Sequence, residues 1–169
     1  MKLKKYDIIL CKNSNTFISL LIRFFTKDKY SHSQLYLGDN HIIDTLYPKG
    51  VTIKHINRSL GYFDVFRYKY DITQRQSEKI DEFIQKKLNT KYDLIELFMQ
   101  IFKIDGGYKN EYTCISLIIE AFKYAGINLG EWKDGFKNIT ESSDFIVIKT
   151  KGLKIKKELD DKVITQVIK

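Results

Sequence analysis

A cysteine, a histidine and an aspartate in this sequence have the residue types and contexts of a thiol hydrolase. Cys114 lies in EYTCISLIIEAF, where the apolar run predicts a buried helix that begins at or beside the cysteine. A thiol at the start of a helix meets the positive end of the helix dipole and unpaired backbone N–H groups, and both favour the thiolate. The same N–H groups could bind an oxyanion that forms on a substrate carbonyl. A lone cysteine can equally be a small core residue, so the functional interpretation requires a base nearby.

His32 is the candidate base. It precedes the alternating segment SQLYLG, which predicts a strand with His32, Gln34 and Tyr36 on one face. An imidazole beside a thiolate is held as imidazolium, stabilises the anion, and later protonates the leaving group. The alternative is an ordinary polar histidine on the surface of a strand.

Asp44 is the candidate partner of His32. The Gly-Asp-Asn sequence at 38–40 predicts a tight turn between strands near 32–37 and 41–46. A hairpin at this turn brings the carboxylate at 44 alongside residues 32–36, where it could fix which ring nitrogen of His32 carries the proton. Alone, Asp44 is equally a polar residue at a strand edge, so the hypothesis depends on the coincidence of all three residues.

The remaining cysteine and histidines are expected to lie outside this site. The same register places His41 on the opposite face of the sheet from His32, and His55 in VTIKHIN is typical of a surface strand. Cys11 ends the first predicted strand and is expected to be a buried thiol. No CxxC or HxxxH spacing is present, so neither a zinc site nor another cofactor is predicted.

The elements that position these residues change in character along the chain. The first part predicts a strand at 6–11, an amphipathic helix at 16–26, and alternating strands up to YFDVFRYKY. The second part predicts a helix capped by Thr73, further helices over DLIELFMQIF and CISLIIEAFKYAG, and a last strand at DFIVIKT. Strands followed by helices are typical of an α+β fold with an antiparallel sheet.

The composition indicates one globular domain with a basic surface. The chain has 169 residues, of which 43% are hydrophobic and 30% charged, and a formal net charge of +8. This length can bury a core without disulfides, and the positive charge favours anionic partners such as lipid, cell-wall polymer or nucleic acid. The N-terminus lacks the pattern of a secretory signal and no stretch is long enough to cross a bilayer. A cytoplasmic location is therefore expected, unless the protein is phage-encoded or leaves the cell by another route.

The order of the motifs resembles the circularly permuted branch of the NlpC-type papain-like cysteine hydrolases. YSHSQLYLGD and IIDT come first, and TKYDLIELF and EYTCISLIIEAFKYAGINL follow much later in the chain. The branch includes the YiiX/YaeF-like permuted amidases, and the lecithin:retinol acyltransferase-like enzymes and a poxvirus protein group share the order. The resemblance spans roughly residues 5–150. It implies a permuted papain-like fold, in which an antiparallel sheet or small barrel packs against a central helix that carries the nucleophile.

The resemblance also implies a role for each motif residue. Cys114 matches the nucleophile, His32 the general base, and Asp44 the polar residue that orients the base. Tyr92 in TKYDL matches a tyrosine that several members place beside the active site, where its hydroxyl could bind the oxyanion or the substrate.

The surroundings of the nucleophile include both further candidates and departures from the family pattern. Tyr112 and Thr113 are candidates for oxyanion or substrate contacts, with packing at the helix entry as the alternative for Tyr112. Many relatives carry Cys-Ser-Glu where this chain has Cys-Ile-Ser, so substrate recognition beside the nucleophile is expected to differ. Many also carry Glu or His where this chain has Asp44, which is expected to shorten and weaken the third member of the site. The tail at 151–169 has no counterpart, and is predicted to be a basic hairpin appended to a hydrolase domain at 1–150.

Two classes of function are compatible with these observations. The first is a thiol-dependent amidase or peptidase that acts through an acyl-enzyme, with a peptidoglycan-like or γ-glutamyl amide as the substrate that the resemblance implies. A lipid acyltransferase or thiol lipase is the related alternative, in which apolar helices at 16–26 and 94–104 would dock on an anionic membrane. The second class is a basic, non-catalytic binding module, because 11 tyrosines and 11 phenylalanines with 29 basic residues could stack on and neutralise nucleic acid. No RNA-binding aromatic motif and no helix-turn-helix is present, so nucleic acid is not the expected partner.

Overall fold

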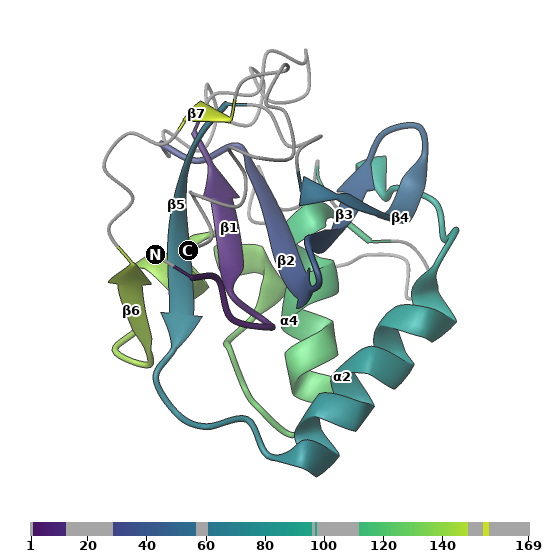
Figure 1. Cartoon of the computed structure of the whole chain (residues 1–169). Coiled ribbons are helices and arrows are strands. Elements are labelled where there is room, and N and C mark those ends of the chain that lie inside the picture. Colours follow the sequence, from purple (N-terminus) through teal and green to yellow (C-terminus); the bar gives the residue numbers. More distant parts are fainter. Residues whose placement is uncertain are drawn as a thin grey trace.

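The fold consists of an antiparallel sheet with helices packed on one face (Figure 1). The structure is a computed structural model, and it describes residues 2–12, 29–56, 61–95, 97, 112–148 and 154–155. The strands lie in the order β4-β3-β2-β1-β5-β6, with the short β7 paired to β5, and every one of these pairings is antiparallel. Their bounds are Ile8–Cys11 for β1, His32–Gly38 for β2, His41–Leu46 for β3, Gly50–His55 for β4, Gly61–Tyr68 for β5, Phe145–Ile148 for β6 and Lys154–Ile155 for β7.

The hairpin of β2 and β3 forms where the sequence predicts it. Asp39 and Asn40 both take positive φ angles, 48° and 59°, which is the backbone that a tight hairpin turn requires and that Asp and Asn tolerate. Leu35 is paired with Ile43, so side chains of equal parity on the two strands share a face. The predicted α+β class with an antiparallel sheet is confirmed.

The two long helices begin at capping boxes. Helix α2, Gln74–Lys87, is capped by Thr73, whose side chain accepts from the backbone N–H of Gln76, as predicted. Helix α4, Cys114–Tyr124, ends shortly before Gly126, which has a φ of +80°. Two short elements follow, the 3₁₀ helix η2 at Trp132–Asp134 and α5 at Lys137–Thr140.

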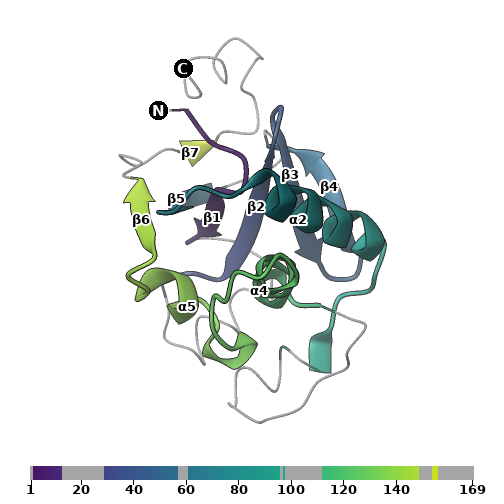
Figure 2. The same ribbon diagram turned by 90° about the horizontal axis from the view of Figure 1, so that it is seen from below.

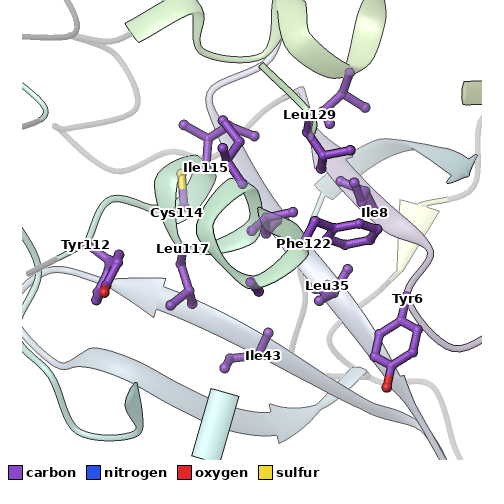
Figure 3. Packing of buried hydrophobic residues seen from close by; sticks show 14 of the residues in the cluster. Tyr6, Ile8, Leu35, Ile43, Tyr112, Cys114, Ile115, Leu117, Phe122 and Leu129 are labelled. Carbon is purple, nitrogen blue, oxygen red and sulfur yellow. The ribbon is translucent and has the colours of Figure 1, made fainter. Parts of the chain in front are cut away.

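Helix α4 lies at the centre of the main hydrophobic core. It packs on β2 and β3 and against α2, and both helices lie on the same side of the sheet (Figure 2). From α4, Leu117 and Phe122 point toward Ile8, Leu35 and Ile43 of the sheet (Figure 3). Because α4 is apolar on most sides, burial in this core rather than helix propensity accounts for most of its stability. A second buried cluster covers the opposite face of the sheet and consists of Ile9, Cys11, Tyr36, Ile42, Ile56, Phe63 and Val65.

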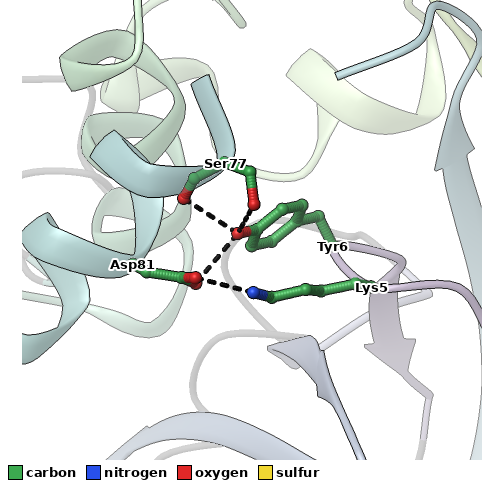
Figure 4. A network of polar contacts seen from close by, with 4 residues as sticks. All are labelled: Lys5, Tyr6, Ser77 and Asp81. Carbon is green, nitrogen blue, oxygen red and sulfur yellow. Dashed lines mark hydrogen bonds and ion pairs between the residues drawn. The ribbon is translucent and has the colours of Figure 1, made fainter. Parts of the chain in front are cut away.

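A polar network ties α2 to the chain that enters β1 (Figure 4). The Tyr6 hydroxyl donates to Asp81 Oδ1 at 2.8 Å and lies 2.7 Å from Ser77 Oγ, while Lys5 Nζ is 2.6 Å from Asp81 Oδ2. Tyr6 itself is 4% exposed and belongs to the main core. Its ring therefore packs in the core while its hydroxyl fixes the first half of α2 against the sheet.

Several predicted elements lie wholly or mostly outside the described residues. These are the helix at 16–26, most of the helix over DLIELFMQIF, and the tail at 151–169 apart from β7. The division of the chain at residue 150 therefore stays a prediction. Within the described ranges, none of the helices has both the length and the apolar character needed to span a membrane.

Gly50 fixes the contact between the sheet and the segment that leads toward Tyr92, and replacing it tests that contact. Gly50 has a φ of +74°, and a Cβ atom there would lie 2.0 Å from the backbone oxygen of Thr90. Gly50→Ala is therefore expected to lower the free energy of unfolding by about 2–3 kcal/mol, since backbone rather than a side chain must move. Urea unfolding followed by circular dichroism measures the loss. Gly38→Ala is the control, because Gly38 has a φ of +95° with nothing within 4 Å of its added Cβ. Equal losses in the two variants would show that the Thr90 contact is unimportant.

Candidate active site

Cys114 is the first residue of α4, and a capping box fixes it there. The Thr113 hydroxyl accepts from the Ser116 backbone N–H at 3.2 Å, and Ser116 Oγ accepts from the Thr113 N–H at 2.9 Å. Neither of these two bonds uses the backbone N–H of Cys114 or of Ile115. Cys114 is 4% exposed, so its thiol lies in a nearly dry environment at the positive end of the helix.

His32 and Asp44 meet across the β2–β3 hairpin. His32 Nε2 lies 2.5 Å from Asp44 Oδ1, and both side chains are buried. The spacing follows from the strand register, because the side chains at 32, 34 and 44 share one face and the residue at 44 is diagonal to the residue at 32. With Nε2 bound to Asp44, the other ring nitrogen, Nδ1, is the one left for the sulfur.

The structure places the Cys114 sulfur beside His32. Burial raises the pKa of the Cys114 thiol, but the charge of His32 and hydrogen bonds from His32 and Ser33 outweigh it, and the net pKa lies below the ordinary cysteine value. Burial lowers the pKa of His32, but the charges of Asp44 and Cys114, with hydrogen bonds to both, raise it well above the ordinary value. Because the pKa of the thiol falls while the pKa of the imidazole rises, both shifts favour the thiolate–imidazolium pair over the neutral pair.

Ser33 is a second polar neighbour of the sulfur. Its hydroxyl is buried and makes no hydrogen bond of standard geometry to the described residues. It nonetheless lies close enough to contribute to the lowered pKa of Cys114. The hydroxyl hydrogen can turn toward the sulfur, and a hydrogen bond from the Ser33 backbone also lowers the pKa of Cys114, so Ser33 contributes both an adaptable and a fixed donor.

Asp44 has two further partners that the sequence interpretation did not assign. Gln34 Nε2 donates to Asp44 Oδ2 at 3.0 Å, and the Lys54 ammonium forms an ion pair with the same oxygen. Burial raises the pKa of the Asp44 carboxyl, but the charges and hydrogen bonds of His32 and Lys54 hold it well below its usual range. The alternation of side chains along β4 could have indicated the contact with Lys54. Asp44 pairs with Thr52, and Lys54 lies two residues beyond Thr52, so its side chain is on the same face of the sheet as that of Asp44.

Cys11 is the other thiol near the site, and its environment differs from that of Cys114. It lies opposite His32 in the β1–β2 ladder and is 5% exposed, so the predicted burial is confirmed. Burial raises the pKa of Cys11 to about 11, and the nearby charge of His32 offsets this only in part. Cys11 is therefore a protonated, unreactive thiol at neutral pH.

The three residues predicted to contact an oxyanion or substrate lie just before Cys114 or pair with that segment. Tyr92 and Tyr112 form an isolated parallel bridge, and Asp93 N–H donates to the Tyr112 carbonyl at 3.2 Å. The Tyr112 ring packs in the core, with its centroid 6.0 Å from that of Phe83, which agrees with the packing alternative. The Thr113 hydroxyl belongs to the helix cap. A substrate role for Tyr92, Tyr112 or Thr113 stays a prediction.

The other two histidines lie together, away from Asp44. His41 and His55 are paired across β3 and β4, with ring centroids 5.8 Å apart. His41 alternates with Ile42 along β3, so it projects from the face opposite to that of Asp44, as predicted. Neither residue is a candidate base for Cys114.

The fold is similar to that of a solved structure whose sequence is distant. YiiX from Escherichia coli O157:H7, which is described as a metalloprotein, matches with a TM-score of 0.68 and 13% sequence identity, over 90% of this chain and 100% of that chain. Within the part of this chain that the structure describes, no group of three or more His, Cys, Asp or Glu side chains could hold a metal ion. No family model matches the sequence, and no curated protein matches it significantly. The chain therefore has a YiiX-like fold of the α+β class, with an antiparallel sheet packed against α4.

Proposed function

We propose that the protein is a cysteine hydrolase with a permuted papain-like arrangement, which cleaves amides through an acyl-enzyme. The observation that carries the proposal is the thiol of Cys114 at the start of a buried helix, beside an imidazole that Asp44 holds from its other side. The chain order also supports it, because the histidine strand precedes the cysteine helix as in the permuted branch that the motifs resemble. Peptidoglycan-like or γ-glutamyl amides are the proposed substrates.

The proposed reaction uses the thiolate and the imidazolium in turn. The Cys114 sulfur attacks the substrate carbonyl carbon, and the carbonyl π-electrons move to the oxygen to give a tetrahedral oxyanion. As the oxyanion collapses, the bond to the amine breaks, and His32 transfers its proton to the departing nitrogen. Neutral His32 then accepts a proton from water, whose oxygen attacks the thioester and releases the acid. The thiolate and imidazolium are restored at the end of the cycle.

The start of α4 is suited to bind the oxyanion. The capping box uses the N–H groups of Thr113 and Ser116 and not those of Cys114 and Ile115, which are the proposed donors to the oxyanion. Donors already fixed in a helix need no reorganisation when charge develops on the substrate oxygen, which is the main source of their catalytic effect.

A lipid acyltransferase or thiol lipase is the second candidate, and one observation favours it. Tyr47, Leu94 and Ile95 are 55%, 41% and 48% exposed. They lie on segments that meet where the rings of Tyr47 and Tyr92 pack together, 6.4 Å apart. Exposed apolar side chains near the nucleophile could contact an acyl chain or an anionic membrane surface.

Acyl-enzyme trapping distinguishes the two candidates. The protein is mixed with γ-glutamyl-p-nitroanilide, with a peptidoglycan stem peptide, or with vesicles of phosphatidylcholine and phosphatidylglycerol, and each reaction is acid-quenched for intact-mass measurement. The proposal expects amide cleavage with a thioester adduct on Cys114, and both absent in Cys114→Ala. An adduct from the lipid alone would assign the second candidate. A Cys114 that stays unmodified, with no cleavage of any of the three donors, would contradict both.

A further inference from the structure

Lys54 stands out among the residues around the site because it is a cation in contact with the carboxylate that holds His32. The Asp44 side chain is fully buried, and its two oxygens are divided between His32 on one side and Gln34 and Lys54 on the other. The Lys54 side chain is 18% exposed, so its ammonium lies at the border of the site while its contact with Asp44 is inside it. Surface lysines do not need such a partner, whereas a buried carboxylate does.

The charges around His32 balance only when Lys54 is included. Within the described residues, the titratable groups that face His32 are Cys11 on β1, Asp44 on β3 with Lys54 behind it on β4, and Cys114 on α4. Cys11 is a neutral thiol at neutral pH. The thiolate and the imidazolium cancel, so Asp44 would leave one uncompensated negative charge in a dry site if Lys54 were absent.

We propose that Lys54 is a positioning residue that offsets part of the charge of Asp44, so that His32 is oriented by a strong acceptor whose negative charge is partly compensated. The inference rests on the proposed function of the Cys114–His32 pair. Asp44 keeps its short contact with Nε2, while the ion pair with Lys54 reduces the negative field that Asp44 exerts on His32. Asp44 alone would favour the imidazolium more strongly, and His32 would then release its proton to a leaving group less readily.

This role has a consequence that a purely structural one does not have. In Lys54→Met the charge of Asp44 is unopposed, so the pKa of His32 is expected to rise by about one pH unit. In Asp44→Asn the Lys54 charge is unopposed, and the pKa of His32 is expected to fall by at least about one unit. In the double variant both charges are gone, so the pKa of His32 returns toward the wild-type value.

The chain makes this measurable because it contains only three histidines. Protein labelled with ¹⁵N-histidine is titrated by two-dimensional NMR in wild type, Lys54→Met, Lys54→Arg, Asp44→Asn and the Asp44→Asn/Lys54→Met double variant. Lys54→Arg keeps the charge and is expected to match wild type. His41 projects from the face of the sheet opposite to that of Asp44, and its signal reports whether the fold is intact.

The outcome depends on the titration midpoint of His32, the pH at which it is half-protonated, in each variant. The proposal expects His32 to titrate at a higher pH in Lys54→Met than in wild type. It also expects His32 to titrate at a higher pH in the double variant than in Asp44→Asn. It is overturned if Lys54→Met leaves the midpoint unchanged, or if the double variant titrates no higher than Asp44→Asn. If Lys54→Met does not fold, the comparison of the double variant with Asp44→Asn still decides, because neither carries the uncompensated Asp44 charge.

A separate readout in the same samples tests the proposed function. Alkylation of each cysteine by iodoacetamide is quantified by peptide mapping. If Cys114 in wild type reacts no faster than Cys11, the proposed function fails whatever the order of the midpoints. If Cys114 reacts fast but the midpoints do not follow the expected order, only the role of Lys54 fails.

Discussion

Cys114→Ala is expected to abolish covalent labelling by a thiol-reactive acyl probe, whereas Cys11→Ala keeps labelling near the wild-type level. The two thiols are both buried, but only Cys114 has a lowered pKa, while burial raises the pKa of Cys11 to about 11. At neutral pH the thiolate fraction of Cys11 is therefore negligible, and the thiolate is the reactive species. Labelling is measured by intact mass, and the modified residue is assigned by peptide mapping.

The paired substitution also controls for the fold. Cys11 belongs to the second hydrophobic cluster and Cys114 to the main core, so each alanine removes a similar buried side chain. Thermal unfolding of both variants shows whether stability changes equally. Labelling of Cys114→Ala at the wild-type level would remove the enzyme interpretation and leave a basic binding module as the remaining class.

His32→Ala is expected to slow labelling at neutral pH roughly a thousandfold, which is within the range for loss of a general acid–base group. Without the imidazolium, only the hydrogen bonds from Ser33 oppose the effect of burial, so the pKa of Cys114 rises and the thiolate forms at higher pH. The loss should therefore shrink as the pH is raised above the ordinary cysteine range. A loss from misfolding would not recover in this way.

The control for His32→Ala is His41→Ala, on the opposite face of the same sheet. His41 contacts His55 rather than Asp44, so its removal is expected to leave labelling unchanged. Rates for both variants are measured from pH 5 to 10 with the same acyl probe. A His32→Ala protein that is labelled as fast as wild type at neutral pH would show that another group activates the thiol.

The directions of the two pKa shifts predict how the proposed activity depends on pH. The proposed reaction requires a deprotonated Cys114, whose pKa is lowered, so the activity is expected to rise at a pH below the ordinary cysteine value. The reaction also requires a protonated His32, whose pKa is raised, so the activity is expected to fall only above the ordinary histidine value. Rates measured from pH 5 to 10 check both limits.

The parts of the site that could be predicted from the sequence depend on local rules. The GDN turn fixes the register of β2 and β3, and this places Asp44 diagonal to His32. The apolar period of CISLIIEAF and the threonine before it place Cys114 at the start of α4. That the cysteine helix lies beside the histidine strand came from the resemblance, because no local pattern joins segments so distant in the chain.

The parts that could not be predicted depend on nonlocal packing. Lys54 meets Asp44 only because β4 continues the sheet beyond β3, and a lysine in an alternating strand is usually a solvated residue. The contact between the Tyr112 ring and Phe83 depends on where α2 packs, which no local pattern around Tyr112 specifies. The position of β6 beside β5 likewise joins residues from distant parts of the chain, and no turn signal specifies it.

The ultraviolet absorbance of the Cys114 thiolate near 240 nm tests the central claim most directly. The signal is recorded as a function of pH in the Cys11→Ala protein, with Cys11→Ala/Cys114→Ala subtracted as the background. The account predicts a thiolate already present well below the ordinary cysteine pKa of about 8.5, and its loss at that pH when His32 is also replaced. A thiol that titrates at or above the ordinary value, with no dependence on His32, would contradict the account.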